Sequence, residues 1–165
     1  MRRWLLAVMV AVMAGQASGQ NLEIRDVFKQ MPDSLMPYLT QNNRLDFLDF
    51  LDSNMKAEVR NRFGGTSEMT GLSEDSLSIR MSSSLRTDLF LMPLSVPVDS
   101  VSSAVVMVET FLTDSVHGQS RVSYFTPEWK QLSVIPPLSE AQQKRIQACF
   151  LQNILKKDEE IVNKH

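Results

Sequence analysis

The sequence predicts an α+β protein in which N-terminal helices and a C-terminal helix flank an antiparallel β-meander of four to five strands. Apolar residues recur at steps of three and four over residues 22–63, which is the helical period. They alternate with polar residues between 66 and 132 and return to the helical period after residue 139. A run of strands between helices is typical of this fold class, and we expect the helices to cover one face of the sheet.

The N-terminal region should contain a long helix that Thr40 or Asn42 caps. Six apolar residues at helical spacing would share one face of it: Leu45, Leu48, Leu51, Met55, Val59 and Phe63. Gly64-Gly65 should end the helix, because glycine adopts the left-handed conformation at little cost. The run Asp52-Ser53-Asn54 could break the helix earlier, since these residues favour caps over helix interiors.

The strands are expected to pair as two antiparallel hairpins, 77–82 with 86–95 and 103–113 with 119–126. Residues 86–94 are apolar at many consecutive positions, which indicates a central strand. Pro93 and Pro97 should end that strand, because proline cannot donate to a ladder. The β-branched segment 104–113 should be the longest strand.

The C-terminal helix is predicted over residues 139–157, with 158–165 frayed. Ser139 and Gln142 have the spacing of a capping box. Its apolar stripe contains Ile146, Cys149, Phe150, Ile154 and Leu155. Cys149 is the only cysteine, so no intramolecular disulfide can form, and we expect its thiol to lie in the core.

The first 19 residues have the features of a cleavable signal peptide. Arg2 and Arg3 precede the apolar run 4–14, and small residues follow at Ala17 and Gly19. That run is shorter than the roughly 20 residues that span a bilayer. We therefore expect cleavage between Gly19 and Gln20 and a single domain over residues 20–165, periplasmic or secreted, with no transmembrane anchor.

Composition and motifs exclude several functions. Without Arg2 and Arg3 of the signal peptide, 15 of the 17 Lys and Arg remain against 19 Asp and Glu, which gives a net charge of −4. This charge and the lack of a basic patch argue against binding to nucleic acid. The only histidines are His117, at a predicted hairpin tip, and His165, so no catalytic set is evident. We expect no cofactor and no metal, and interpret Asp46, Asp49 and Asp52 as a solvated helix face.

Tyr124, Phe125 and Trp129 cluster around Pro127 and form the candidate binding surface. Aromatic rings offer large contact areas to glycans or peptides, although such clusters also form core corners. A non-catalytic binding or interaction module is the leading hypothesis, with an envelope protein, a glycan or a small apolar ligand as partner. A carrier of a small, lipid-like hydrophobic ligand between sheet and helices, and an enzyme with an unrecognised site, are the alternatives.

Four stretches resemble an uncharacterised family of small exported proteins of Bacteroidales bacteria. They are residues 31–39 (MPDSLMPYL), 43–46 (NRLD), 64–70 (GGTSEMT) and 75–81 (DSLSIRM). The resemblance extends over about residues 24–138. It implies a Gram-negative envelope setting, and it transfers no activity and no functional residue.

Asp-Ser followed by an apolar residue recurs at predicted element boundaries, with the serines at Ser34, Ser76, Ser100 and Ser115. Asp and Ser side chains bond to nearby backbone N–H groups, so turn chemistry explains the pattern. The triplet also resembles the O-glycosylation acceptor of exported proteins in those bacteria, so these four serines are candidate modification sites.

Cleavage should leave Gln20 as the first residue of the exported protein, because Ala17 and Gly19 are the small pair correctly placed after the apolar run. Intact-mass measurement on the exported material checks this. A mature species that retains Trp4 would contradict the prediction.

Overall fold

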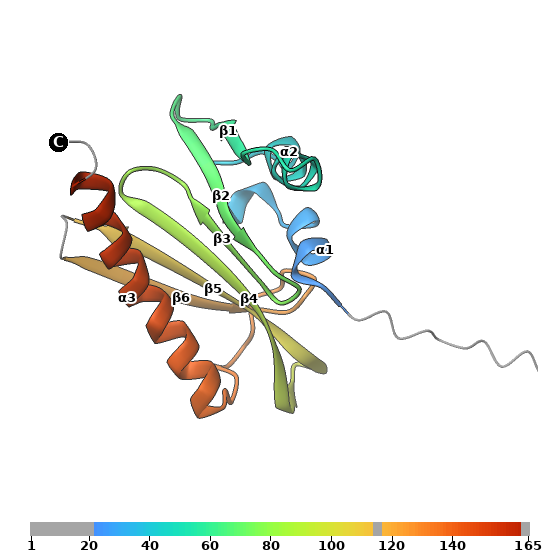
Figure 1. The fold of residues 1–165 in the computed structure, drawn as a ribbon. Helices are drawn as coiled ribbons and strands as arrows, with labels where there is room; N and C mark the ends of the chain where they lie inside the picture. Colours follow the sequence, from blue (N-terminus) through green and yellow to red (C-terminus); the bar gives the residue numbers. More distant parts are fainter. Residues whose placement is uncertain (1–21, 114–116, 163–165) are drawn as a thin grey trace, which may run out of the picture.

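The computed structural model describes residues 22–113 and 117–162. Figure 1 shows one twisted sheet with helices on both sides. The helices are α1 (Ile24–Lys29), the short 3-10 helix η1 (Asp33–Leu35), α2 (Gln41–Asp52) and α3 (Glu140–Val162). The strands are β1 (Glu58–Arg60), β2 (Thr66–Leu72), β3 (Ser76–Arg80), β4 (Leu85–Val98), β5 (Val101–Leu112) and β6 (Gly118–Phe125).

The sheet is an antiparallel meander in the order β1-β2-β3-β4-β5-β6. Both predicted hairpins are confirmed: Ile79 lies opposite Thr87 in the first, and Val108 lies opposite Val122 in the second. The sheet has six strands, not four to five, because β1 and β2 also join it. β1 has three residues and β2 is mostly polar, so neither shows the apolar alternation that predicts a strand.

The predicted helical stripe through Phe63 is wrong beyond Leu51. α2 ends at Asp52, and Asn54 adopts a left-handed conformation with φ of 53°, so the break at Asp52-Ser53-Asn54 is where the helix stops. Val59 is buried as a strand residue of β1, while the Met55 and Phe63 side chains are 55% and 67% exposed. The spacing of three and four residues is compatible with a helix. The run Asp52-Ser53-Asn54 nevertheless ends the helix, because its residues favour caps over helix interiors.

The predicted cap at Thr40 is confirmed. The Thr40 hydroxyl accepts from the Asn43 N–H at 3.2 Å, and the Asn43 amide oxygen accepts from the Thr40 N–H at 3.1 Å. β4 does not end at Pro93 but continues to Val98, past a register irregularity between these residues. It is therefore longer than β5, and its prolines are tolerated because this end of the hairpin is largely exposed to solvent.

Helices cover both faces of the sheet, which corrects the expectation of a single covered face. α1 and α2 enclose the larger core with strand residues such as Leu77, Ile79, Leu89 and Val105. α3 covers the opposite face, where Cys149 is buried against Phe90, Met92, Val106 and Val108, as predicted for the thiol. The central strands need both layers because residues 86–92 and 104–110 are buried without alternation.

Polar contacts also hold α3 to the sheet. The predicted capping box is present, with Ser139 N–H donating to Gln142 Oε1 at 2.8 Å. Asn153, further along α3, donates to buried Asp88 at 2.8 Å and to Thr110 at 3.2 Å. The helix extends to Val162, beyond the predicted end at residue 157.

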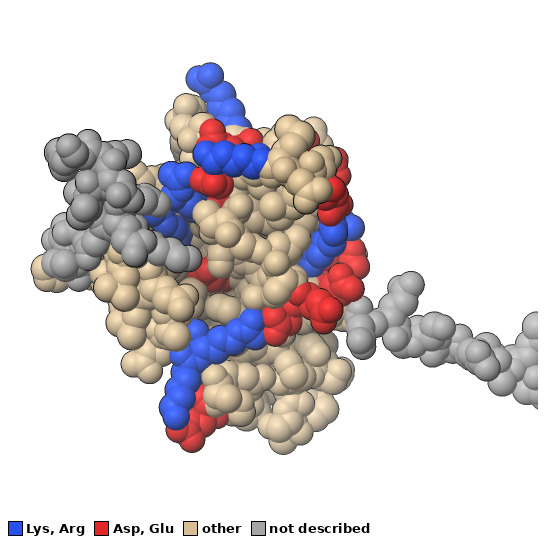
Figure 2. All heavy atoms as spheres, viewed as in Figure 1, with Lys and Arg blue, Asp and Glu red and all other residues tan. Residues whose placement is uncertain are grey.

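Figure 2 shows Lys and Arg side chains near Asp and Glu side chains on a face that is otherwise largely uncharged. One of the ion pairs links layers: Arg145 of α3 donates to Asp75, just before β3, at 2.6 and 2.8 Å, and to the Ser76 hydroxyl at 3.0 Å. Within the described ranges, no helix combines the length and apolar character needed to cross a membrane.

The Asp75–Arg145 pair should make stability depend on pH. Hydrogen bonding from Arg145 lowers the Asp75 pKa from its ordinary 3.8 to about 2. Because the folded pKa is the lower one, the stabilisation is full above pH 4 and is lost as pH falls from 4 through 2. Both side chains are 40–50% exposed, so solvent screening limits the contribution to about 1 kcal/mol.

Urea unfolding of Asp75→Asn should show a lower free energy of unfolding than the unmodified protein at pH 7 and a similar one near pH 2. Asp46→Asn, at an exposed position of α2, is the control and should change little at either pH. An unchanged pH profile in Asp75→Asn would contradict the assignment.

Candidate functional site

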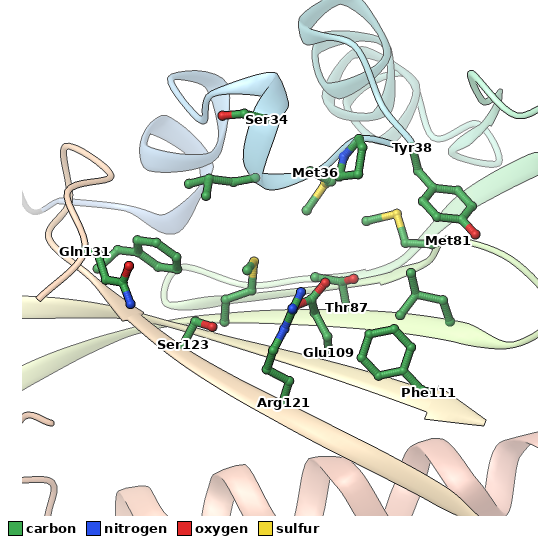
Figure 3. A pocket seen from close by; sticks show the side chains of 15 residues that line it. Ser34, Met36, Tyr38, Met81, Thr87, Glu109, Phe111, Arg121, Ser123 and Gln131 are labelled. Atoms are coloured by element: carbon green, nitrogen blue, oxygen red, sulfur yellow. The ribbon is translucent and has the colours of Figure 1, made fainter. Parts of the chain in front are cut away.

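The layer formed by α1 and α2 does not extend over all of the sheet, and a groove of about 570 Å³ lies at its margin. The segment 34–38 forms the roof, and strands β4, β5 and β6 form the floor. Figure 3 shows Met36 and Tyr38 above the sheet, with Thr87, Glu109 and Arg121 beneath them. Phe111 lies toward one end and Gln131 toward the other (Figure 3).

Arg44 of α2 holds the roof in place. Its side chain is 1% exposed, and its Nη1 donates to Asp33 Oδ1 at 2.9 Å while its Nη2 donates to the Met31 carbonyl. Both acceptors lie immediately before the roof segment. A buried guanidinium is costly without such partners, so the bonds bind η1 and the following residues to α2.

The floor carries an ion pair between neighbouring strands. Glu109 of β5 lies directly opposite Arg121 of β6, and Arg121 Nε donates to Glu109 Oε2 at 2.7 Å. The Glu109 side chain is 12% exposed and that of Arg121 is 65% exposed, so the carboxylate lies beneath and the guanidinium faces solvent. The Arg121 guanidinium also lies 6.0 Å from the centre of the Phe111 ring.

The remaining lining is largely apolar. Three methionines from separate segments meet there: Met36 from the roof, Met81 after β3 and Met107 from β5. Leu85 and Phe125 add to this surface. The groove is open, because lining residues such as Ser34, Phe111 and Gln131 are exposed. Such a site can bind an apolar group and place a polar or charged group beside Arg121.

Comparison with known proteins identifies a family. A family model described as "Protein of unknown function (DUF3256)" matches residues 16–164. The chain belongs to this family. The predicted membership in an uncharacterised family is thereby confirmed, and no curated protein matches the chain.

One solved structure similar to this DUF3256 protein is titled as a domain of an uncharacterized protein from Porphyromonas gingivalis W83. The two share 23% sequence identity, with a TM-score of 0.54, over 77% of this chain and 68% of that chain. At this identity the likeness shows a common fold and nothing about activity.

The three aromatic residues predicted as a binding surface are not brought onto one face of the DUF3256 fold. Tyr124 packs toward α3, while Phe125 and Trp129 lie in the core on the α1 side, with ring centroids 5.7 Å apart. Trp129 Nε1 donates to the Val27 carbonyl at 2.8 Å, so this ring is a core corner. Phe125 is 5% exposed and still contributes to the groove lining.

The candidate glycosylation serines differ in their surroundings. Ser34 is exposed at the groove, and Ser100 is exposed in the β4–β5 turn with φ of 68°. Ser76 is half-buried, and its hydroxyl bonds to Ser73 at 2.8 Å and to Arg145. Ser115 and the cleavage site at Gly19 and Gln20 lie outside the described residues.

His117 precedes β6 and is exposed, and it does not line the groove. Asp46 and Asp49 are exposed along α2, as expected for a solvated helix face. Over residues 22–113 and 117–162, no group of three or more His, Cys, Asp or Glu side chains is placed to hold a metal ion.

The Glu109–Arg121 pair is not among the site residues predicted from the sequence. The signal was available, because the predicted hairpin of 103–113 with 119–126 places these residues nearly opposite each other, and Glu109 interrupts an apolar strand. The roof offered no such signal. Its position depends on Arg44, whose burial is a tertiary contact that charge alone does not predict.

Arg44→Met should lower the free energy of unfolding by about 2–4 kcal/mol, since Asp33 and the Met31 carbonyl lose their charged donor. Arg62→Met is the matched control at an exposed arginine and should cost less than about 0.5 kcal/mol. Equal unfolding midpoints in urea for the two variants would show that Arg44 does not hold the roof.

Proposed function

We propose that this protein is an exported, non-catalytic binding module and that the groove between segment 34–38 and strands β4–β6 is its ligand site. The observation that carries the proposal is the combination of an apolar lining with a fixed, partly exposed arginine in one open groove. Ligand sites in proteins are typically concave and apolar, with a few placed polar groups.

The walls of the groove support binding without large rearrangement. The roof is bonded to α2 through buried Arg44, and the floor consists of the two longest strands with β6. A site whose shape exists before the ligand arrives costs less ordering entropy on binding. The groove therefore has the physical properties of a preformed site.

The chemistry of the groove lining supports a binding function without catalysis. Glu109, an acid in the groove, accepts two hydrogen bonds from Arg121 at one carboxylate oxygen, Oε2, so that oxygen is bonded to a cation. A general base must be free to reach a substrate proton, and His117 does not line the groove.

Export is supported by the leader-like residues 1–19 and by the family resemblance. In that setting the partner is an envelope protein, a glycan or a small apolar ligand. The mild net negative charge and the mixed charges of Figure 2 argue against a polyanionic partner such as nucleic acid.

A carrier of a small hydrophobic ligand is the second candidate. The three methionines of the lining favour it, because flexible thioether side chains adapt to varied apolar ligands. Exposed lining residues and the Glu109–Arg121 pair count against it, because a lipid-like chain is better shielded in an enclosed cavity.

Ser123→Trp should fill the groove, because Ser123 lies on its floor in β6. Peptides selected from a phage-displayed random dodecapeptide library on the unmodified protein should lose affinity about tenfold or more on this variant. Ser102→Trp, at an exposed position of β5, is the matched control and should bind as the unmodified protein does.

Equal affinity for all three proteins would show that the ligand site lies elsewhere. Binding of a long-chain fatty acid that Ser123→Trp blocks, with no peptide selected, would instead establish the carrier function.

A further inference from the structure

β6 is an edge strand whose outer side is partly unpaired. Near its end, the Leu132 N–H donates to the Tyr124 carbonyl at 3.0 Å, and the Thr126 N–H donates to the Lys130 carbonyl at 2.7 Å. Successive peptide groups of a strand point to opposite sides, so Ser120 and Val122 face outward, as Tyr124 does. Within the described residues, the outward N–H and C=O groups of Ser120 and Val122 have no hydrogen-bond partner.

The opposite edge of the sheet is treated differently. β1 has three residues, and the Arg60 carbonyl accepts from the Asn43 side chain of α2 at 3.5 Å. The Arg62 N–H that follows donates to the Tyr38 carbonyl at 3.0 Å. Proteins commonly cover or shorten their edges to prevent unwanted pairing. This fold protects the edge at β1, whereas the outer side of β6 is open at Ser120 and Val122 within the described residues.

Hollows lie against both faces of β6 at this open edge. The groove lies on the α1–α2 side, and a second hollow of about 270 Å³ lies along Val122 and Tyr124, bordered by the segment 131–135. Ser123 and Gln131 line both. Exposed apolar side chains, Ile135 at 76% and Val134 at 58%, border the second hollow.

We propose that the groove binds an extended peptide segment of a partner protein, which adds to β6 as a further antiparallel or parallel strand. This proposal rests on the proposed binding function and names its ligand class. An added strand would pair with the outward groups of Ser120 and Val122. Its side chains alternate between faces, so successive residues would enter the groove and the second hollow in turn.

Charge identifies the peptide further. Arg121 presents a 65% exposed guanidinium on the groove side of β6, while Glu109 lies beneath it. Arg121 Nε and Nη2 bond Glu109, and within the described residues Nη1 makes no hydrogen bond. An acidic residue of the incoming strand opposite Arg121, with apolar residues two positions away on either side, can bond this remaining nitrogen.

The same charge disfavours a second copy of this chain as the occupant. β6 reads GQSRVSYF, with one arginine and no acid. If two β6 strands paired about Val122, the two Arg121 side chains would approach each other on the same side of the joined sheet. In that register each Arg121 lies opposite Ser123 of the other copy, so the pairing offers neither arginine an acidic residue.

Val122→Pro tests the edge. Proline removes the outward N–H and leaves every β5–β6 hydrogen bond in place, because prolines are tolerated on the open side of an edge strand. Val122→Ala is the matched control, since it loses the valine side chain and keeps the N–H. Thermal unfolding of both variants establishes that each is folded.

The probe is the set of peptides selected from the random dodecapeptide library on the unmodified protein. They should carry an acid flanked at two-residue spacing by apolar residues. We expect them to bind Val122→Ala nearly as well as the unmodified protein, and Val122→Pro about tenfold more weakly or worse. Amide exchange at Ser120 and Val122 should slow on binding.

Suppose that the selected peptides bind Val122→Pro as tightly as Val122→Ala but lose affinity for Ser123→Trp. This result would overturn strand addition and leave the groove as the binding site. If none of the variants changes the affinity for the selected peptides, the groove is not the binding site, and the proposed function is overturned as well. A dimer that Val122→Pro dissociates would show that a second copy occupies the edge, and would overturn the proposal of a partner peptide.

Discussion

β4 and β5 pair residue by residue from Leu85 opposite Phe111 to Pro93 opposite Ser103, and both strands are buried on both faces through most of that length. Each large apolar side chain left in water would forgo about 1.5–3 kcal/mol of burial. A two-strand ribbon that is apolar on both sides therefore needs cover from two directions. The chain supplies α1 and α2 from the segment before the sheet and α3 from the segment after it (Figure 1).

The two covering layers differ in kind, and the difference locates the candidate site. α3 lies along the central strands and adds polar anchors, among them Asn153 on Asp88 and Arg145 on Asp75. On the other face, α1 and α2 end short of β6, and only the roof segment reaches over the floor. The groove thus lies where the helical layer stops short of the sheet edge. Arg44 and the Glu109–Arg121 pair hold its walls in position.

The open groove and the open edge of β6 occur at the same margin. β6 contributes Arg121, Ser123 and Phe125 to the groove, while among the described residues its outward backbone groups at Val122 have no hydrogen-bond partner. Main-chain hydrogen bonds provide affinity without sequence preference, and side-chain hollows provide selectivity. The chain belongs to the DUF3256 family, and it shares its fold with the Porphyromonas gingivalis domain.

The sequence alone determined the fold class, both central hairpins, the Thr40 and Ser139 caps and the burial of Cys149, because period, capping and turn chemistry act between residues close in the chain. It could not distinguish a helix from a turn and strand for Met55, Val59 and Phe63, since one spacing fits both. Tertiary structure alone decided that the helices lie on opposite faces, that Phe125 and Trp129 point away from Tyr124, and that Arg44 is buried. The groove follows from these contacts, because its roof and floor are separated by some 50 to 90 residues of chain and meet only when α2 packs beside the completed sheet.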